Sequence, residues 1–328
     1  MILKGFTIIG TKQIGKANKH NESKTRVSGI IVELWGYSCY GGKLCFYGMI
    51  ILKLSQTLIH IILNTRVGGF GMTKIEKPLG HTVWFKIILT LLIFVPGYSQ
   101  IPYAQIDTTS VIASVLARPL IVSIPWLLPV FKLLLLCVTI MPFVFKEKAE
   151  KAVVGYYIVI LVIVGVFQNT AQTEAYGFVW LFGNTLIQFA VLGFCIYDLI
   201  KGKSTIQKQY FNRKRCWIIP LMLLAYLMPY AVSDAGTAIP AFNSNVFYNE
   251  SGVTYCMITP VIVGIMLLFS KGIHKPTLSI VSYVGFIFGL LNIATWFGAR
   301  RESWWMGILH LPLVVVALYG LIIAHKER

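Results

Sequence analysis

Charged residues are scarce in this sequence. They make up 12% of its 328 residues, while 56% are hydrophobic, and about a quarter of an average soluble domain is charged. A chain this poor in charge cannot cover a large water-exposed surface, but helices that face lipid do not need one. The apolar residues lie in continuous runs rather than in alternation, which favours spanning helices over a barrel. The predicted fold class is therefore all-α, a polytopic helix bundle integral to a membrane.

Acidic residues are the scarcest charged type. The chain has 12 Asp and Glu against 29 Lys and Arg, a formal net charge of +17. The largest basic stretch is Lys201–Arg215, with six basic residues and no acidic one. The basic residues cluster in short loops between apolar runs, as expected of cytosolic loops in membrane proteins. This pattern explains the charge without a nucleic-acid partner, and none is expected.

Several common site patterns are missing. The six cysteines form no CxxC pair, so neither a disulfide framework nor a zinc site is predicted. No HExxH, GxSxG or P-loop motif occurs. His310 is the only histidine well inside an expected helix, which argues against a haem held by two intramembrane histidines. No metal and no cofactor is predicted.

Residues 1–71 differ from the rest of the chain. Their one apolar run, Leu44–Leu63, contains Lys53, Gln56 and His60, so it makes a poor spanning helix. The segment lacks the features of a signal peptide. It is either a cytosolic tail with an interfacial helix, or an extension that is not translated because synthesis starts at Met72; the second interpretation is slightly favoured. Residues 72–328 form a single transmembrane domain.

Eight apolar segments follow Met72. The expected helices cover about 82–98, 120–145, 152–170, 177–200, 216–233, 253–270, 278–297 and 303–325.

Loop charges orient these eight helices. If Lys201–Arg215 is cytosolic, alternation also places the basic segments 146–151 and 271–277 inside, with both termini cytosolic. The outer loops 99–119, 171–176 and 234–252 hold a single basic residue, Arg118. The short loop Gly298–Glu302 also falls outside, and it departs from this charge pattern because it carries Arg300 and Arg301. The predicted location is the cell membrane, with the lipid bilayer as the first partner.

The first outer loop carries a helix signal of its own. Asp107 can cap the following turn, and Val111, Ile112, Val115 and Leu116 share one face. A short amphipathic helix on the outer surface is expected, ending at Arg118.

Polar residues inside the expected helices crowd toward the outer side. This bias predicts an outward-opening polar cavity, because polar groups within a bilayer are costly unless they are used or paired. Lys132, near the centre of the second helix, is expected at its floor and in contact with water. The predicted ligand-binding residues are Lys132, Asn184, Gln188, Asn292 and His310, and those of the charged outer mouth are Glu174, Asp234, Arg300 and Arg301.

Each of these residues also has a purely structural interpretation. Asn184 and Gln188 can serve as hydrogen-bonding contacts between helices, and His310 can be a packed histidine with its hydrogen bonds satisfied.

The favoured function is a small-solute transporter or solute-binding membrane protein, whose ligand is a small polar or anionic solute. An enzyme is less favoured; its form would be an intramembrane enzyme acting on a lipid or lipid-linked group at the outer leaflet, with His310 as base. The third alternative is a structural or assembly subunit of a membrane complex.

Overall fold

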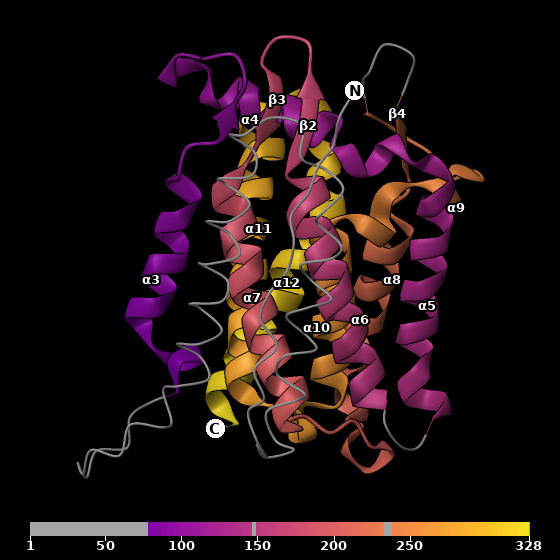
Figure 1. The fold of residues 1–328 in the computed structure, drawn as a ribbon. Coiled ribbons are helices and arrows are strands. Elements are labelled where there is room, and N and C mark those ends of the chain that lie inside the picture. The colour runs from indigo at the N-terminus through magenta and orange to yellow at the C-terminus, as the bar shows by residue number, and fades with distance from the viewer. Residues whose placement is uncertain (1–77, 146–148, 233–237, 328) are drawn as a thin grey trace, which may run out of the picture. The chain divides into compact units, whose positions relative to one another are not determined.

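The structure, a computed structural model, describes residues 78–145, 149–232 and 238–327. The extension 1–71 and Asp234 lie outside the described residues. The described chain is mostly helical, and its long helices run side by side between two ends (Figure 1). We call one the sheet end, because the strands lie there together with two short helices. The other is the basic end, where the loop Lys201–Arg215 lies.

The main helices are α3 (Val83–Leu91), α5 (Leu128–Val144), α6 (Ala149–Ile163), α7 (Phe182–Lys201), α8 (Ile219–Leu227), α10 (Tyr255–Leu268), α11 (Lys275–Ala294) and α12 (Trp304–Lys326). The two short helices at the sheet end are α4 (Thr108–Ala117) and α9 (Asn245–Tyr248). Both α6 and α11 finish in a wide π-helical turn, Val164–Gln168 and Thr295–Ala299 respectively.

Among the described residues, six helices are long and apolar enough to cross a membrane, or seven if one sharply bent pair counts as a single span. This supports a multi-pass membrane protein and does not confirm the expected eight spans. Two expected spans are short: Val83–Phe94 has 12 residues, and α8 has 9. At 1.5 Å per residue, neither reaches across a hydrocarbon core of about 30 Å.

Local sequence explains where these short helices stop. The helix Val83–Phe94 ends before Pro96, since the residue before a proline disfavours the helical conformation. The helix α8 ends at Leu227, where Met228 adopts a left-handed backbone with φ of +44° and Pro229 follows. A left-handed backbone is costly for a residue other than glycine, so the surrounding contacts must hold Met228 in place.

The second expected helix begins later than predicted. A 3₁₀ turn covers Leu120–Ser123 and a second begins at Pro125, so that α5 starts only at Leu128. Ile124 between these turns has a non-helical backbone, as expected before a proline. Pro125 and Pro129 therefore lie at the start of the helix, where a missing N–H leaves no carbonyl unpaired.

A small antiparallel sheet was not predicted. It joins β1 (Tyr98–Ser99), β3 (Gly177–Trp180) and β2 (Thr170–Thr173) in that order, with Thr170 opposite Trp180. Gly177 supplies the positive φ of +63° that the β2–β3 turn requires. The fourth expected helix was thus wrong at its start, because Phe178, Val179 and Trp180 form a strand and α7 begins at Phe182.

The short helix predicted to end at Arg118 is confirmed as α4; its position on the outer surface stays a prediction. Asp107 occupies the capping position, although its side chain makes no capping hydrogen bond. Val111 and Val115 are buried against Ala171 and Val179 of the sheet, while Ile112 and Leu116 are partly exposed. The segment Gln105–Ser123 is one of the six helices that are long and apolar enough to cross a membrane. Its 10-residue α-helix nevertheless packs on the sheet at one end of the bundle (Figure 1).

The helix α10 forms the centre of the bundle. Every residue from Met257 to Leu268 is buried, because α10 packs against α8, α11 and α12. A helix that faces lipid on no side contributes only to packing and to contacts inside the protein. Before α10, the segment Asn245–Val253 meets it at an angle of 80°. A two-stranded sheet, β4 (Tyr230–Val232) with β5 (Ala238–Pro240), leads into this segment.

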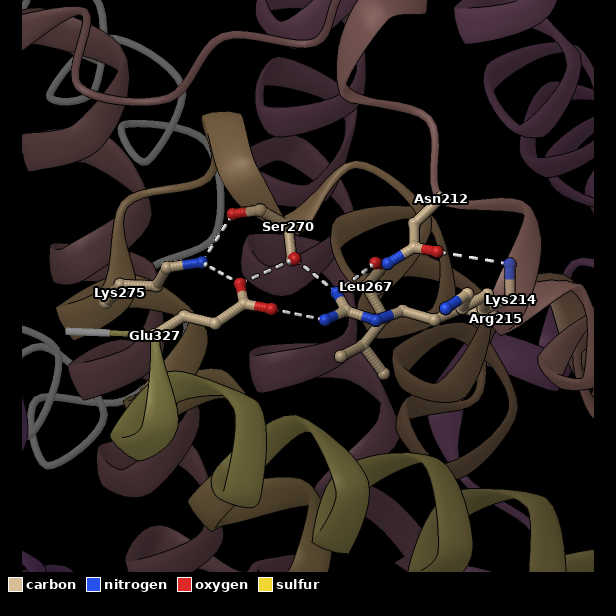
Figure 2. A network of polar contacts seen from close by, with 7 residues as sticks. All are labelled: Asn212, Lys214, Arg215, Leu267, Ser270, Lys275 and Glu327. Atoms are coloured by element: carbon tan, nitrogen blue, oxygen red, sulfur yellow. Dashed lines mark hydrogen bonds and ion pairs between the residues drawn. The ribbon is translucent and has the colours of Figure 1, made fainter.

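At the basic end, Glu327 ties three segments together (Figure 2). Its carboxylate accepts hydrogen bonds from Arg215 of the basic loop, from Ser270 Oγ at 2.8 Å and from Lys275 Nζ at 2.9 Å. The Arg215 guanidinium also donates to the carbonyl of Leu267, at the end of α10, at 2.8 Å. Although partial burial alone would raise the pKa of Glu327, the hydrogen bonds from Lys275, Ser270 and Arg215 lower it to about 2.

Other contacts bring further loops to the same end. The Asp198 carboxylate, at the end of α7, accepts from both the backbone N–H and the hydroxyl of Ser204, at 2.8 and 2.6 Å. The N–H of Thr205 donates to Gly272 at 2.7 Å. The segments 201–215, 271–277 and the end of α12 therefore share one end, as loop charge predicted for cytosolic segments.

Candidate functional site

The end of α8 is held by Lys132. The Lys132 side chain is only 2% exposed, and its ammonium donates to Leu227 O at 3.2 Å, to Val246 O and to Asn249 Oδ1 at 2.7 Å. An ammonium has three N–H donors, so all three are used. It also lies 5.2 Å from the centre of the Tyr226 ring. A cation at a helix C-terminus is favoured by the helix dipole, which places partial negative charge there.

Two side chains complete this arrangement, which we call the Lys132 cluster (Lys132, Asn249, Ser251 and the carbonyls of residues 226–228 and 246). Asn249 Nδ2 donates to Leu227 O at 2.9 Å and to Met228 O at 2.8 Å. Ser251 Oγ donates to Tyr226 O at 2.7 Å. The carbonyls of Tyr226, Leu227 and Met228 thus each receive a hydrogen bond, which an apolar environment requires.

This geometry corrects the expectation that Lys132 is in contact with water. Its ammonium meets protein oxygens instead, among them the carbonyls of Leu227 and Val246. Gly252 brings the two parts close: a β-carbon there would lie 2.6 Å from the backbone nitrogen of Lys132.

A second group surrounds the π-helical turn of α6. The carbonyl of Gly165 accepts from Asn169 Nδ2 at 3.0 Å and from Thr185 Oγ1 of α7 at 2.7 Å. Asn169 also donates to Gln188 Oε1 at 3.1 Å. Gln188 is buried, and Asn184, one turn earlier, is half-buried. Gln188 therefore joins two helices, the structural role that its position also suggested.

A third group surrounds the π-helical turn of α11. The Trp296 ring stacks on His310, with centroids 6.1 Å apart and planes at 29°, and the Arg300 guanidinium lies 5.7 Å from the centre of the Trp296 ring. Asn292 Nδ2 donates to Phe288 O at 2.8 Å and contacts Cys256 Sγ at 3.2 Å. The indole N–H of Trp296 is buried without a hydrogen-bond partner.

The tautomer of His310 follows from its hydrogen bond with Met306. Its Nδ1 lies 2.8 Å from the carbonyl of Met306, which can only accept. The hydrogen is therefore on Nδ1, and in the neutral ring Nε2 carries a lone pair. Together with the unpaired Trp296 N–H and the Arg300 guanidinium, the third group offers both donors and an acceptor.

The five predicted ligand-binding residues fall into these three groups, and their hydrogen bonds do not join one group to another. A methionine-rich cluster lies between the first and third groups: Met228, which ends α8, packs with Met257 and Met306, and Trp296 contacts the same cluster. Of the predicted mouth, the three described residues Glu174, Arg300 and Arg301 are all exposed, and among these three Arg300 alone contacts a group described above.

Asn249 and Ser251 are functional candidates that sequence reasoning missed. The triplet Asn249-Glu250-Ser251 matches the N-glycosylation pattern, which says nothing about a contact inside the bundle. Its position immediately before Gly252 and an apolar helix was the available signal, because a small residue permits close approach of two backbones.

Comparisons with known proteins do not add a family. No protein-family model matches this chain, and neither a curated protein nor a solved structure is similar enough to count as a match.

Proposed function

We propose that this protein is a small-solute transporter or solute-binding membrane protein whose site lies in the half of the bundle next to the sheet end. The observation that carries the proposal is the discontinuous backbone there. The helix α8 stops inside the bundle, and α10 is preceded by a segment bent away by 80°.

Broken helices support a binding role for a physical reason. Irregular backbone at membrane depth is tolerated only where it is buried in protein or lines a cavity. In many transporters, the ends of such broken helices hold the substrate or a coupling ion. The two π-helical turns support the same half of the bundle, since these turns are frequent at functional sites.

The third group is the part best suited to contact a ligand. Trp296, His310 and Arg300 supply an unpaired donor, an acceptor and a cation. These groups suit a small polar or anionic solute, for example a carboxylate or a phosphate ester, because the guanidinium pairs with such oxygens. In this proposal Lys132 positions α8, while Asn292 belongs to the ligand surface. Asn184 and Gln188 remain candidates on the neighbouring helix.

The proposal also gives an orientation. The basic end is cytosolic and the sheet end external, because Lys and Arg accumulate in cytosolic loops. In that orientation the end of α12 and the segment before α3 both lie on the cytosolic side of a cell membrane.

Uptake into proteoliposomes tests the site. Purified protein is assayed with a panel of radiolabelled amino acids, carboxylates and phosphate esters, and the same compounds are tested for thermal stabilisation. Arg300→Gln is expected to reduce uptake or stabilisation at least about 10-fold, the loss of one charge-assisted hydrogen bond.

Arg301→Gln is the matched control, since Arg301 is exposed in the same short turn and is expected to behave as the unaltered protein. If the two variants lose the response equally, or neither does, the assignment of the third group fails.

The second candidate is an intramembrane enzyme, favoured by the Nε2 lone pair of His310, which suits a general base. Incubation with anionic lipids followed by mass spectrometry of the products separates the two. A transporter gives no product, whereas an enzyme gives one that disappears in His310→Phe.

A further inference from the structure

The Lys132 cluster has the composition of a cation-binding site. Two backbone carbonyls, Leu227 O and Val246 O, and one amide oxygen, Asn249 Oδ1, converge on a single point. Neutral carbonyl and amide oxygens at the C-terminal end of a helix are the ligands that hold alkali cations in membrane proteins. At this point lies the Lys132 nitrogen.

We propose that these oxygens form a monovalent-cation site and that the ammonium of Lys132 occupies it permanently. The chain therefore carries its own cation in place of a bound inorganic one. Lys132 extends from α5 and places its ammonium among these oxygens. The contact between α5, α8 and the segment 245–253 is therefore independent of dissolved salt.

The surroundings of Lys132 favour a tethered cation over an ion pair. Glu250, the acidic residue nearest in sequence to Asn249, accepts a hydrogen bond from the Tyr230 hydroxyl. The three hydrogen bonds of the Lys132 ammonium all go to uncharged oxygens. The site thus binds through oxygen dipoles, which would serve equally for K⁺ or NH₄⁺.

Lys132→Met gives a direct test. A methionine side chain is one atom shorter than lysine, so the substitution keeps the apolar stem and vacates the position of the nitrogen. The purified variant is heated in detergent with KCl, NH₄Cl, NaCl or choline chloride at equal ionic strength, and unfolding is followed by tryptophan fluorescence.

We expect a saturable rise in the Tm of Lys132→Met of about 5–10 °C in K⁺ or NH₄⁺ relative to choline, the shift expected near 100-fold excess over Kd. Na⁺ is expected to act more weakly, because NH₄⁺ resembles K⁺ in size. The unaltered protein should show no difference among the four salts. In Lys132→Met combined with Asn249→Ala, the response should be lost, since one of the three oxygens is gone.

Two results overturn the proposal. One is a Lys132→Met protein that responds to K⁺ and NH₄⁺ no more than to choline, which means that water or nothing fills the vacated position. The other is an unaltered protein with the same cation response as the variant, which places the cation elsewhere.

A second variant covers a folding failure of Lys132→Met. Lys132→Ala leaves room for propylammonium, which restores the missing carbons and the charge, and 1-propanol is the neutral match. Stabilisation by propylammonium beyond that by 1-propanol supports a cation site. Equal effects of the two compounds show that only the missing volume must be filled, and they reject the proposal. A failure of both variants to fold in every salt rejects it as well.

Discussion

Replacing Gly252 by alanine should separate the turn Glu250–Val253 from α5. The added β-carbon would lie 2.6 Å from the backbone nitrogen of Lys132, 2.8 Å from its α-carbon and 2.9 Å from the carbonyl carbon of Phe131. All three are backbone atoms of a helix, so none can rotate away. The turn must move by several tenths of an ångström or more, and it carries Asn249 and Ser251 with it.

The expected cost is that of overpacking a rigid contact, about 1–3 kcal/mol. For a domain of this size, each kcal/mol lowers Tm by roughly 2–4 °C, so Gly252→Ala should unfold about 2–12 °C lower in detergent. Gly155→Ala is the matched control, because a β-carbon there meets nothing within 4 Å. Alanine is the better helix former by about 1 kcal/mol, so this control should gain stability.

The reasoning is refuted if both glycine variants shift Tm in the same direction, or if Gly252→Ala leaves it unchanged. If the protein tolerates a methyl group whose carbon would lie 2.6 Å from the backbone nitrogen of Lys132, the turn does not rest on α5 in solution. The cation response of Lys132→Met should also weaken when Gly252→Ala is added, because Asn249 moves.

The remaining predictions concern three other contacts. Glu327→Gln should lower Tm at neutral pH; because the folded pKa of this carboxyl is below its ordinary 4.5, the loss should shrink as pH falls from about 4.5 toward 2. The control Glu302→Gln, at the other end, should have little effect. Gln188→Leu should cost about 0.6–1 kcal/mol in denaturant unfolding, the worth of an intramembrane hydrogen bond. Gly177→Ala should cost about 1–2 kcal/mol for its left-handed backbone.

Each of these has an outcome that contradicts it. An unchanged pH profile in Glu327→Gln would show that the carboxylate does not pair with Arg215 in solution. A loss larger than about 2 kcal/mol in Gln188→Leu would mean that Gln188 does more than join two helices. A neutral Gly177→Ala would place the β2–β3 turn in another conformation.

The helical class and the helix ends set by hydropathy were predictable from the sequence. The expected segments 152–170, 253–270, 278–297 and 303–325 agree with α6, α10, α11 and α12 to within a few residues, π-helical turns included. Long apolar runs determine these helices almost alone, since each residue contributes independently to insertion. The grouping of the basic loops at one end was predictable for the same reason.

The broken helix and its lysine were not predictable. The apolar run 216–233 continues past Leu227, yet the helix stops there, at the left-handed backbone of Met228 before Pro229. That conformation depends on Asn249 and Lys132, which lie 21 and 96 residues away in the sequence. The strand Gly177–Trp180 was missed as well; it pairs with β2 across a short turn and with β1, which lies far earlier in the chain.

The Glu327 contact has a consequence for how the protein is made. Arg215 and Glu327 are 112 residues apart, so at about 5–20 residues per second the arginine waits roughly 6–22 s for its carboxylate to leave the ribosome. During that interval the guanidinium has Leu267 and Ser270 as its described hydrogen-bond partners, once α10 has formed. The end of α12 can therefore dock only after α10 has formed. Ribosomes stalled before Glu327 should yield a basic end that proteases cut more readily.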